Sequence, residues 1–545
     1  MENRTLLAIV LSFLVLVLYQ WLFVPAQKHP PVQPTGQHAL MPPIPRQALT
    51  PREGVNPPYL PQQPAGAKTV YVSTPFYSAE LSTDNLTIKH WYLKDYRTGL
   101  GKKSPSVDLI DTPSPAIYPL WESFDGSSFS VPAHIPYTCS GFTLTVKDKG
   151  ARADIVCSYN EQGIGIKKII TFYGNSYTAT VELAVENRSN KPATERLGIN
   201  WIGLSGELGS RYNIADGIVL INNSRETIEA KSLNLSKSYD GLITWFGIEN
   251  VYFIQTVLPH ESAPSHLYAT KAGTGAEGLV PLLLTYIYNA VSIPPHSVQT
   301  KTYTIFLGPK AIDVLDNVGS SLNRAIYFGW ANVIAKPLFY VLRFIDRFTG
   351  NYGWAIVLLT ILIKILLFPL GQISYKSMRQ MQKLAPKINE LKEKYKNDKE
   401  KLYRETTNLY RSYKINPLSG CLPMLLQIPI FFALYEVLLA AIELRHAPFI
   451  WWIKDLSAPD TIGTIHLMSF TVGIHVLPLV MGMTMFAQQA LTPTTTDPAQ
   501  AKLFLWFMPL FLTVILWKFP SGLALYWTMN NLFSIGQQYY ILKKY

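Results

Sequence analysis

The sequence predicts an α-helical polytopic membrane protein that also carries an exported all-β sandwich domain. Three observations predict this fold class. The composition has 48% hydrophobic and only 15% charged residues. Several apolar stretches have about the length of a membrane span, and a long central region consists of short alternating runs. Three cysteines in 545 residues are too few for a disulfide scaffold.

Residues 1–25 predict an uncleaved signal anchor, the first of six transmembrane helices. Arg4 precedes an uninterrupted apolar stretch from Leu6 to Val24, and no A-x-A-like cleavage site follows that stretch. A cleaved signal peptide is the alternative. Residues 26–65 are rich in proline, so we expect an extended, disordered linker between this helix and the rest of the chain.

Residues 66–330 predict a β-sandwich in which no catalytic constellation is visible. The clearest pattern lies in 167–186, where two alternating runs flank a Gly-Asn turn. A period of two with turn residues between the runs predicts antiparallel strands with one buried face. The alternating residues are Ile169, Thr171 and Tyr173 in the first strand, and Val181, Leu183 and Val185 in the second.

Residues 142–156 predict another hairpin, which turns near Lys149 and Gly150. Cys139 and Cys157 flank it. Because an exported domain lies in an oxidising compartment, we expect these two cysteines to form a disulfide across the hairpin.

Residues 331–350 predict an amphipathic helix that lies at the membrane surface. Lys336, Arg343 and Arg347 can share one helical face, with apolar residues largely on the other. The segment is too short and too charged to span a bilayer. Packing of the same helix on the β-domain is the alternative.

Residues 351–545 predict a five-helix membrane core with an internal basic segment. That segment, 372–418, contains twelve Lys and Arg against five Asp and Glu, which is +7 of the chain's net charge of +12. Lys and Arg concentrate on the cytoplasmic side of membrane proteins, so we expect both termini inside and the β-domain outside. Because the charge gathers in one loop, we expect no DNA binding. The five apolar stretches are 353–371, 422–442, 467–487, 503–518 and 522–541.

Apolar residues in 372–418 recur at steps of three and four, which predicts two helices packed as an antiparallel hairpin. Pro386 should kink or restart the first helix. The solvent face is strongly basic, so we expect it to bind the ribosome or the cytoplasmic part of another protein. A solvated loop that only sets topology is the alternative. The lysines that we single out are Lys392, Lys394, Lys396 and Lys399.

Lys364 is the most informative residue, because it lies inside the apolar stretch 353–371. A cation within a span costs about 2.5–3.5 kcal/mol on insertion scales, so it normally faces a polar or hydrated interior. A lysine that snorkels to the headgroups is the alternative. Other polar residues within the spans suggest a hydrated indentation open to the inner leaflet, although each could simply join two helices. They are Thr360, Gln427, Glu436, Asn530, Asn531, Ser534 and Gln537.

The sequence predicts neither a metal site nor a cofactor. His446, His466 and His475 have no metal-ligand spacing and no acidic companion. No HExxH, GxSxG or P-loop motif occurs, so we expect no enzymatic activity. Glu436 lies about 10 Å farther out than Lys364 by helix rise, so we expect no direct ion pair between them.

Five segments occur in order within 350–541: GNYGWAIVLLTILIKILLFPL, SYKSMRQMQKLAPKI, KINPLSGCLPMLLQIPIFFALYEVL, ELRHAPFIWWIKDLSAPD and FPSGLALYWTMNNLFSIGQQ. They closely resemble the YidC/Oxa/Alb insertase family, and the exported β-domain resembles its Gram-negative subgroup in architecture. The resemblance implies an insertase and chaperone for nascent membrane proteins in the bacterial inner membrane, acting alone or with the Sec translocon.

The resemblance also implies a hydrophilic groove that bears one cation and is open to cytoplasm and lipid. Lys364 stands where family members carry arginine. Tyr526 falls at a substrate-contacting aromatic position, and Trp527 follows it where many members have a second tyrosine. A small-molecule transporter that uses Lys364 and Glu436 is the rival hypothesis, but the sequence lacks the two repeated halves of such a transporter.

Overall fold

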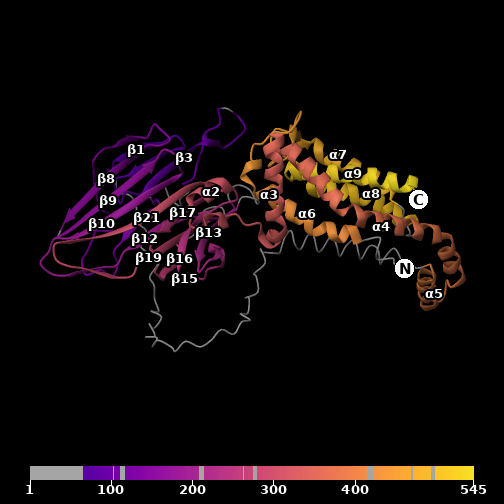
Figure 1. Ribbon diagram of the computed structural model, residues 1–545, viewed down its shortest axis with the longest axis horizontal. Helices are drawn as coiled ribbons and strands as arrows, with labels where there is room; N and C mark the ends of the chain where they lie inside the picture. The colour runs from indigo at the N-terminus through magenta and orange to yellow at the C-terminus, as the bar shows by residue number, and fades with distance from the viewer. Residues whose placement is uncertain are drawn as a thin grey trace.

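The computed structural model describes residues 66–101, 103–110, 117–161, 163–207, 214–261, 263–273, 279–413, 422–467, 470–492 and 498–544. Figure 1 shows an elongated molecule in which a β-rich domain and a bundle of helices lie end to end. The predicted signal anchor, residues 1–25, and the predicted linker, residues 26–65, lie outside the described residues.

Two sheets build the β-domain. The smaller sheet has the strand order β4 (Ser106–Asp108), β3 (Ile88–Arg97), β2 (Tyr77–Ser82), β1 (Thr69–Ser73) and β7 (Thr143–Thr145). The larger sheet has the order β15 (Ser236–Gly241), β18 (Ser265–Lys271), β19 (Val280–Ile287), β12 (Gly198–Glu207), β13 (Ile214–Ile221), β16 (Ile243–Glu249), β17 (Phe253–Pro259), β21 (Ser297–Pro309), β10 (Thr178–Asn187), β9 (Ile164–Tyr173), β8 (Arg152–Glu161) and β6 (Thr138–Cys139). The remaining strands are β14 (Ser224–Ile228), which pairs with β13, β5 (Trp121–Ser123), which pairs with β12, and the pair β11 (Ala193–Glu195) and β20 (Val291–Ile293).

One hydrophobic cluster joins the inward faces of both sheets. Val70 and Trp91 come from the smaller sheet, and Phe172 and Val181 come from the larger one; all four are fully buried. Burial of such side chains is the main favourable term in folding. The two sheets therefore form the predicted sandwich.

Strands β9 and β10 form the predicted hairpin in 167–186, with Ala179 opposite Phe172. The three alternating residues of β10 are buried, as predicted. The phase predicted for β9 is wrong. Its inward residues are Lys168, Ile170 and Phe172, because a lysine occupies an inward position that the apolar pattern did not mark. The residues on the other face of β9 are Ile169, Thr171 and Tyr173, all half-buried.

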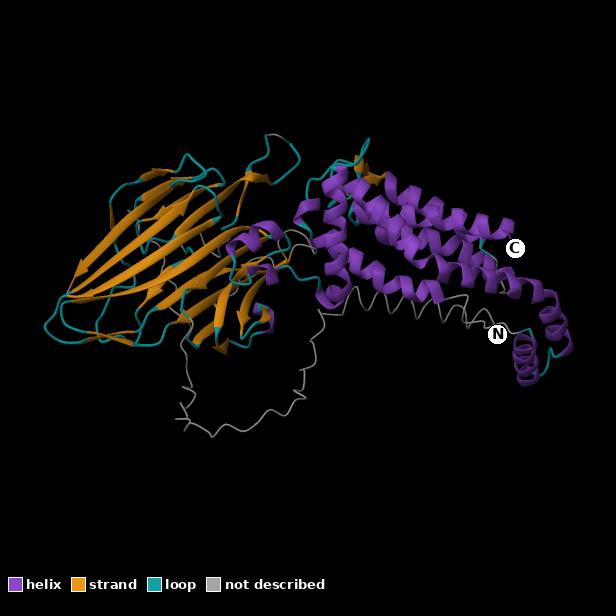
Figure 2. Cartoon of the chain, in the orientation of Figure 1, coloured by secondary structure: helices purple, strands orange, loops and turns teal. Residues whose placement is uncertain are grey.

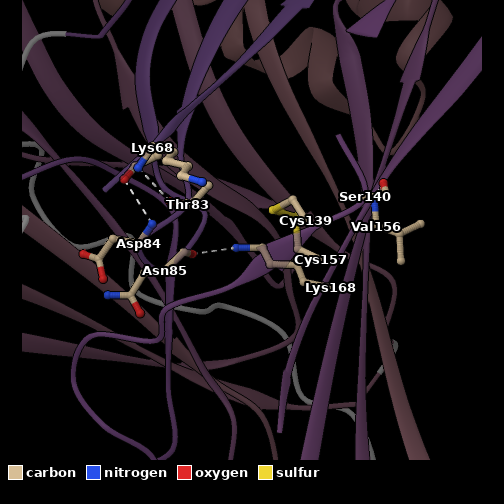
Figure 3. The surroundings of a disulfide bond; sticks show 10 residues. Lys68, Thr83, Asp84, Asn85, Cys139, Ser140, Val156, Cys157 and Lys168 are labelled. Atoms are coloured by element: carbon tan, nitrogen blue, oxygen red, sulfur yellow. Dashed lines mark hydrogen bonds between the residues drawn. A yellow bond between two sulfur atoms is a disulfide. The ribbon is translucent and has the colours of Figure 1, made fainter. Parts of the chain in front are cut away.

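The predicted hairpin across 142–156 is wrong, because its two strands join different sheets. β7 pairs in parallel with β1, whereas β8 pairs with β6 and β9. The chain therefore crosses between the sheets where a turn was expected. Cys139 instead lies opposite Cys157 across β6 and β8, and a disulfide joins them (Figure 3).

A buried ion pair lies beside this disulfide. Lys168 is opposite Cys157 in the register of β8 and β9, and its ammonium lies 2.9 Å from the Glu122 carboxylate. Both side chains are fully buried. The ammonium also donates to the Asn85 carbonyl at 3.2 Å (Figure 3), and the Tyr303 hydroxyl donates to Glu122 at 2.7 Å. Burial lowers the pKa of Lys168, while the Glu122 carboxylate opposes that shift.

Helices make up most of the chain after residue 310, as Figure 2 shows. Within the described residues, one helix is long and apolar enough to cross a membrane, α4. Three shorter apolar helices cover Gln427–Ala440, Val476–Leu491 and Leu505–Lys518. The α-helices are α2 (Ile312–Val318), α3 (Asn332–Thr349), α4 (Tyr352–Lys394), α5 (Lys399–Ser412), α6 (Leu422–Ala440), α7 (Val476–Leu491), α8 (Pro498–Ile515) and α9 (Ser521–Lys544).

Two boundaries of the helical core differ from the prediction. The stretch 467–487 does not begin as a helix, because strands β22 (Thr461–Leu467) and β23 (Phe470–His475) pair before α7 starts. Both strands are rich in Thr, Ile and Val, which favour strands. Pro386 does not restart a helix, since α4 continues through it to Lys394.

The far end of α4 packs against α5, as the steps of three and four predicted. Met381, Leu384 and Ile388 form a small buried cluster with Leu409 and Tyr410. This cluster is separate from the main hydrophobic core. The two helices therefore form a hairpin with an apolar centre of its own.

Helix α3 covers the predicted amphipathic segment and packs against α4 and α6. Phe339 and Leu342 are buried, whereas Val333 and Phe348 are 84% and 76% exposed. Arg343 pairs with Asp313 of α2 at the junction with the β-domain. The helix therefore presents one apolar face outward rather than burying it on the β-domain.

Candidate functional site: a polar seam in the helical core

Four polar side chains from three helices meet inside the helical core, and we call them the polar seam. They are Lys364 of α4, Gln427 of α6, and Asn530 and Ser534 of α9. The Lys364 ammonium donates to the Ser534 hydroxyl at 2.7 Å, and the Gln427 amide donates to the Asn530 side-chain carbonyl at 2.6 Å. The seam thus joins α9 to α4 and to α6.

Helical spacing places the two α9 residues on one face. Asn530 and Ser534 are four residues apart, and residues at that spacing lie one above the other on a helix. The Ser534 hydroxyl also donates to the Asn530 backbone carbonyl at 2.8 Å, which orients its oxygen to accept from Lys364. Asn530 and Ser534 are 9% and 3% exposed, whereas Lys364 is only half-buried.

Lys364 lies well inside its helix and has a neutral partner. It is the thirteenth residue of α4, about 18 Å along the helix from Tyr352. Its ammonium forms no ion pair with any of the described residues. Glu436 does not pair with it there, as predicted from their different heights. The seam can therefore accept an anionic or hydrogen-bonding group without displacing a carboxylate.

Two aspartates that the sequence analysis gave no role organise the segment between α6 and β22. Asp460 accepts hydrogen bonds from the Leu477 backbone at 2.6 Å and from the Trp452 indole at 2.9 Å. Asp455 accepts from the backbones of His446 at 3.1 Å and Ser457 at 2.8 Å. Both residues stand in a quoted segment, ELRHAPFIWWIKDLSAPD, and a carboxylate followed within two residues by serine is a recognisable turn signal.

The same segment is fixed to the ends of two long helices. The backbones of Ser521 and Gly522, at the start of α9, donate to the carbonyls of Ala458 and Leu456 at 2.8 and 2.9 Å. At the start of α4, a Cβ on Gly353 would lie 2.0 Å from the Phe449 ring, so only glycine allows this contact. The segment thus ties the starts of α4 and α9 together.

Comparisons with known proteins match this architecture along the whole chain. Residues 69–341 match the family model described as the YidC periplasmic domain, and residues 344–545 match the one described as 60Kd inner membrane protein. The membrane protein insertase YidC of Pelobacter propionicus is 40% identical over 100% of this chain and 99% of its own length. That of Syntrophus aciditrophicus is 38% identical over the full length of both chains. This chain belongs to the YidC membrane protein insertase family.

Membership in the YidC family fixes the broad function and place of the chain. It is an inner-membrane protein with a periplasmic β-sandwich domain and a helical core, and it acts as a membrane protein insertase rather than as an enzyme. The periplasmic match ends at residue 341, inside α3, and the membrane-protein match begins three residues later. The helix α3 therefore joins the two parts.

Not every residue that the sequence analysis assigned to the groove lies in the seam. Thr360 is one turn from Lys364, but it is fully buried and its hydroxyl donates to the Ile356 carbonyl. Tyr526 is buried one turn before Asn530. Trp527 packs edge-on against the Phe431 ring of α6, with ring centroids 4.7 Å apart.

Asn531 lies outside the seam, although the sequence grouped it with Asn530. Its amide donates to the Thr484 hydroxyl of α7 at 3.2 Å. Gln538 donates both to Thr492, just after α7, at 3.1 Å and to the Tyr375 hydroxyl of α4 at 3.0 Å. Adjacent residues on a helix point about 100° apart, so Asn530 faces α6 while Asn531 faces α7.

The four lysines singled out in the hairpin lie where α4 and α5 meet. Lys392 and Lys394 are exposed in the last turn of α4, and Lys396 is exposed in the connecting turn. Lys399 is the first residue of α5. The lysines are therefore concentrated at the tip of the hairpin, about 45 Å along α4 from Lys364 to Lys394.

Proposed function

We propose that the polar seam receives the polar or acidic segment of a client protein during insertion. The observation that carries this proposal is the Lys364 ammonium, which sits between helices with a neutral hydroxyl as its hydrogen-bond partner. A client carboxylate could pair with it in surroundings of lower dielectric than water, where the attraction is stronger. Lysine offers a point charge rather than the two-pronged donor of arginine, so it can also donate to carbonyl groups in many orientations.

The amide and hydroxyl groups of the seam would form hydrogen bonds with the polar groups of a client in place of water. Gln427 and Asn530 bond each other and can exchange that bond for one to a client backbone. The client's apolar helix then leaves for lipid and gains about 25 cal/mol per Å² of apolar surface buried. The segment held by Asp455 and Asp460 keeps the β-domain end closed, so the client enters from the opposite end.

We further propose six transmembrane helices, of which the first lies in residues 1–25 and the other five lie in residues 351–545. The excess of +7 in 372–418 supports a cytoplasmic position for the α4–α5 hairpin. Both termini are then cytoplasmic and residues 66–330 are periplasmic. Residues 331–350 lie at the membrane surface, which the exposed apolar face of α3 supports.

The partners follow from this arrangement. The lysines at the hairpin tip form a basic surface that suits ribosomal RNA, and a nascent client would reach the seam along α4. The Sec translocon is a second proposed partner, because an insertase with a lipid-facing seam can receive helices that leave a neighbouring channel. Membrane lipids complete the wall of the seam.

The seam proposal is tested by a series of clients whose translocated tails differ only in charge. Lys364→Ala should reduce insertion of an acidic tail about tenfold, since a charge-assisted hydrogen bond contributes about 1.5–3 kcal/mol. It should change insertion of a neutral tail little. Lys364→Arg should insert both tails as the parent does. Insertion is measured as protease protection of the tail in vesicles that contain each variant.

A matched control uses Lys518, the last residue of the 3-10 turn Leu516–Lys518 that follows α8. Lys518→Ala removes the same charge from the core and should leave both tails unaffected. If Lys364→Ala inserts acidic and neutral tails as well as the parent does, Lys364 only anchors its helix by snorkelling, and the proposal is wrong.

A further inference from the structure

The loop between β3 and β4 carries an exposed leucine at the membrane end of the β-domain. Leu100 is 55% exposed and lies between Gly99 and Gly101. Figure 2 shows this loop, in teal, extending from the strands toward the helices. The loop is described at residues 98–101 and 103–105.

The loop keeps its shape through its own hydrogen bonds. The Thr98 backbone donates to the Pro105 carbonyl at 3.0 Å, and the Ser104 backbone donates to the Gly101 carbonyl at 2.9 Å. The Arg97 guanidinium donates to the Ser104 carbonyl at 2.8 Å. These bonds close the turn without burying Leu100, so the leucine is presented outward by a structured loop.

The base of the loop is tied to the helical core. Arg445, five residues after the end of α6, donates to the Arg97 carbonyl at 2.6 Å. Its guanidinium also lies over the rings of Tyr252 and Phe253, 5.9 and 5.6 Å from their centroids. In the orientation proposed above, α6 leaves the bilayer just before Arg445. The loop therefore starts at the level of the outer headgroups.

The neighbouring residues have the composition of a membrane interface. Lys103, three residues after Leu100 in the chain, is exposed and forms no ion pair within the described ranges. Trp451, six residues after Arg445, is 83% exposed and stacks on Trp452. Exposed tryptophans and lysines beside an apolar residue are typical of protein surfaces that contact the headgroup layer of a membrane.

We propose that the β3–β4 loop binds the outer leaflet of the inner membrane, with Leu100 in the interface and Lys103 against anionic phosphate headgroups. A lone exposed leucine on a soluble surface needs no explanation. Here the base of the loop is bonded to Arg445 beyond the end of α6, so in the orientation proposed above the loop lies at the outer membrane surface. The β-domain then rests on lipid at a second point, which limits its tilt relative to the core.

The test places a fluorophore at position 100 of the full chain in vesicles. The variant Leu100→Cys is made with Cys421→Ser, while the bonded Cys139 and Cys157 stay unlabelled. The control is Val298→Cys, because Val298 is 57% exposed at the start of β21, which runs for 13 residues, roughly 40 Å, toward the core. Quenching is measured with nitroxide-headgroup lipid in phosphatidylcholine vesicles with and without one-third phosphatidylglycerol.

The loop proposal predicts at least twofold stronger quenching at position 100 than at position 298, and a further increase with phosphatidylglycerol. Lys103→Glu should remove the increase and Lys103→Arg should retain it. Quenching at position 100 equal to that at position 298 would overturn the proposal. So would quenching that appears only when a second protein is added, because the loop would then be a protein-binding surface.

Discussion

Lys168 of the β-domain and Lys364 of the helical core are both enclosed by the fold, and their surroundings differ. Lys168 of the β-domain is fully buried, lies 2.9 Å from the Glu122 carboxylate and also donates to the Asn85 carbonyl. Lys364 of the helical core is half-buried and donates to the Ser534 hydroxyl. The β-domain balances its buried charge within the fold, whereas the described core leaves its charge available to another molecule.

The difference separates a structural charge from a functional one. A buried charge whose partner is present holds the fold in one arrangement, and removal of that partner is costly. A charge with a neutral partner gains little for the fold, so its presence points to a role outside the fold. The comparison therefore makes opposite predictions for stability in the two regions.

The largest effect is expected from Glu122→Gln, which leaves the Lys168 ammonium buried with a neutral partner. Loss of one member of a buried pair costs about 3–5 kcal/mol of unfolding free energy. The measurement is denaturant unfolding of the full chain in detergent, followed by tryptophan fluorescence of the β-domain. The matched double variant, Glu122→Leu with Lys168→Met, should recover most of the loss. If the single variant is as stable as the parent, the pair has no structural role.

A smaller, pH-dependent effect is expected at Glu195, a buried carboxyl without a hydrogen-bond partner among the described residues. Burial raises its pKa to about 7, although Lys301 acts in the opposite direction. Because the folded state holds the proton more tightly than the unfolded state, Glu195 lowers stability as the pH rises from about 4.5 through 7. Glu195→Gln does not titrate. It should therefore match the parent below pH 4.5 and exceed it by about 1–3 kcal/mol at pH 8.5.

Unfolding curves of parent and Glu195→Gln at the two pH values provide the measurement, and all other groups are the same in both. A constant difference between them across this range would contradict the assigned cause.

The smallest effect is expected from Lys364→Met. This change removes a half-buried charge that has no counter-ion in the described core, so the unfolding free energy should stay within about 1 kcal/mol of the parent or rise. Thermal unfolding of the full chain in detergent measures it. A loss of about 3 kcal/mol or more would show that Lys364 supports the fold as Lys168 does, and the comparison would fail.

Much of the fold could be predicted from the sequence, because long apolar stretches and strict alternation are local signals. The β9–β10 hairpin and α3 followed from their periods. The pairing of β7 with β1 could not be predicted, since it depends on a crossing between sheets. The inward face of β9 was predicted wrongly because it includes a lysine. Lys168 can occupy that buried position because it pairs with Glu122, which is distant in sequence.

The sequence pointed to the residues of the candidate site, but the contacts between them could not be predicted. Lys364 was visible because a cation in an apolar stretch is rare. Ser534 and Gln427 could be named only as two of several polar residues within the spans. Their contacts join α4, α6 and α9, and such contacts between distant segments are not encoded locally. The contact of Asn531 with Thr484 of α7 could not be predicted for the same reason. The roles of Asp455 and Asp460 depend on where α7 and α9 begin, which the sequence placed differently for α7.

Moving the charge across the seam tests the central claim most directly. Lys364→Ser removes the cation, and the double variant Lys364→Ser with Ser534→Lys restores it on α9, across the 2.7 Å contact. Insertion of acidic and neutral tails is compared in vesicles with equal amounts of each variant. The account predicts that the single variant loses about tenfold in acidic-tail insertion and that the double variant recovers most of it, with neutral tails unchanged. A double variant that is folded but inserts acidic tails no better than the single variant would contradict the claim that the seam acts through its charge.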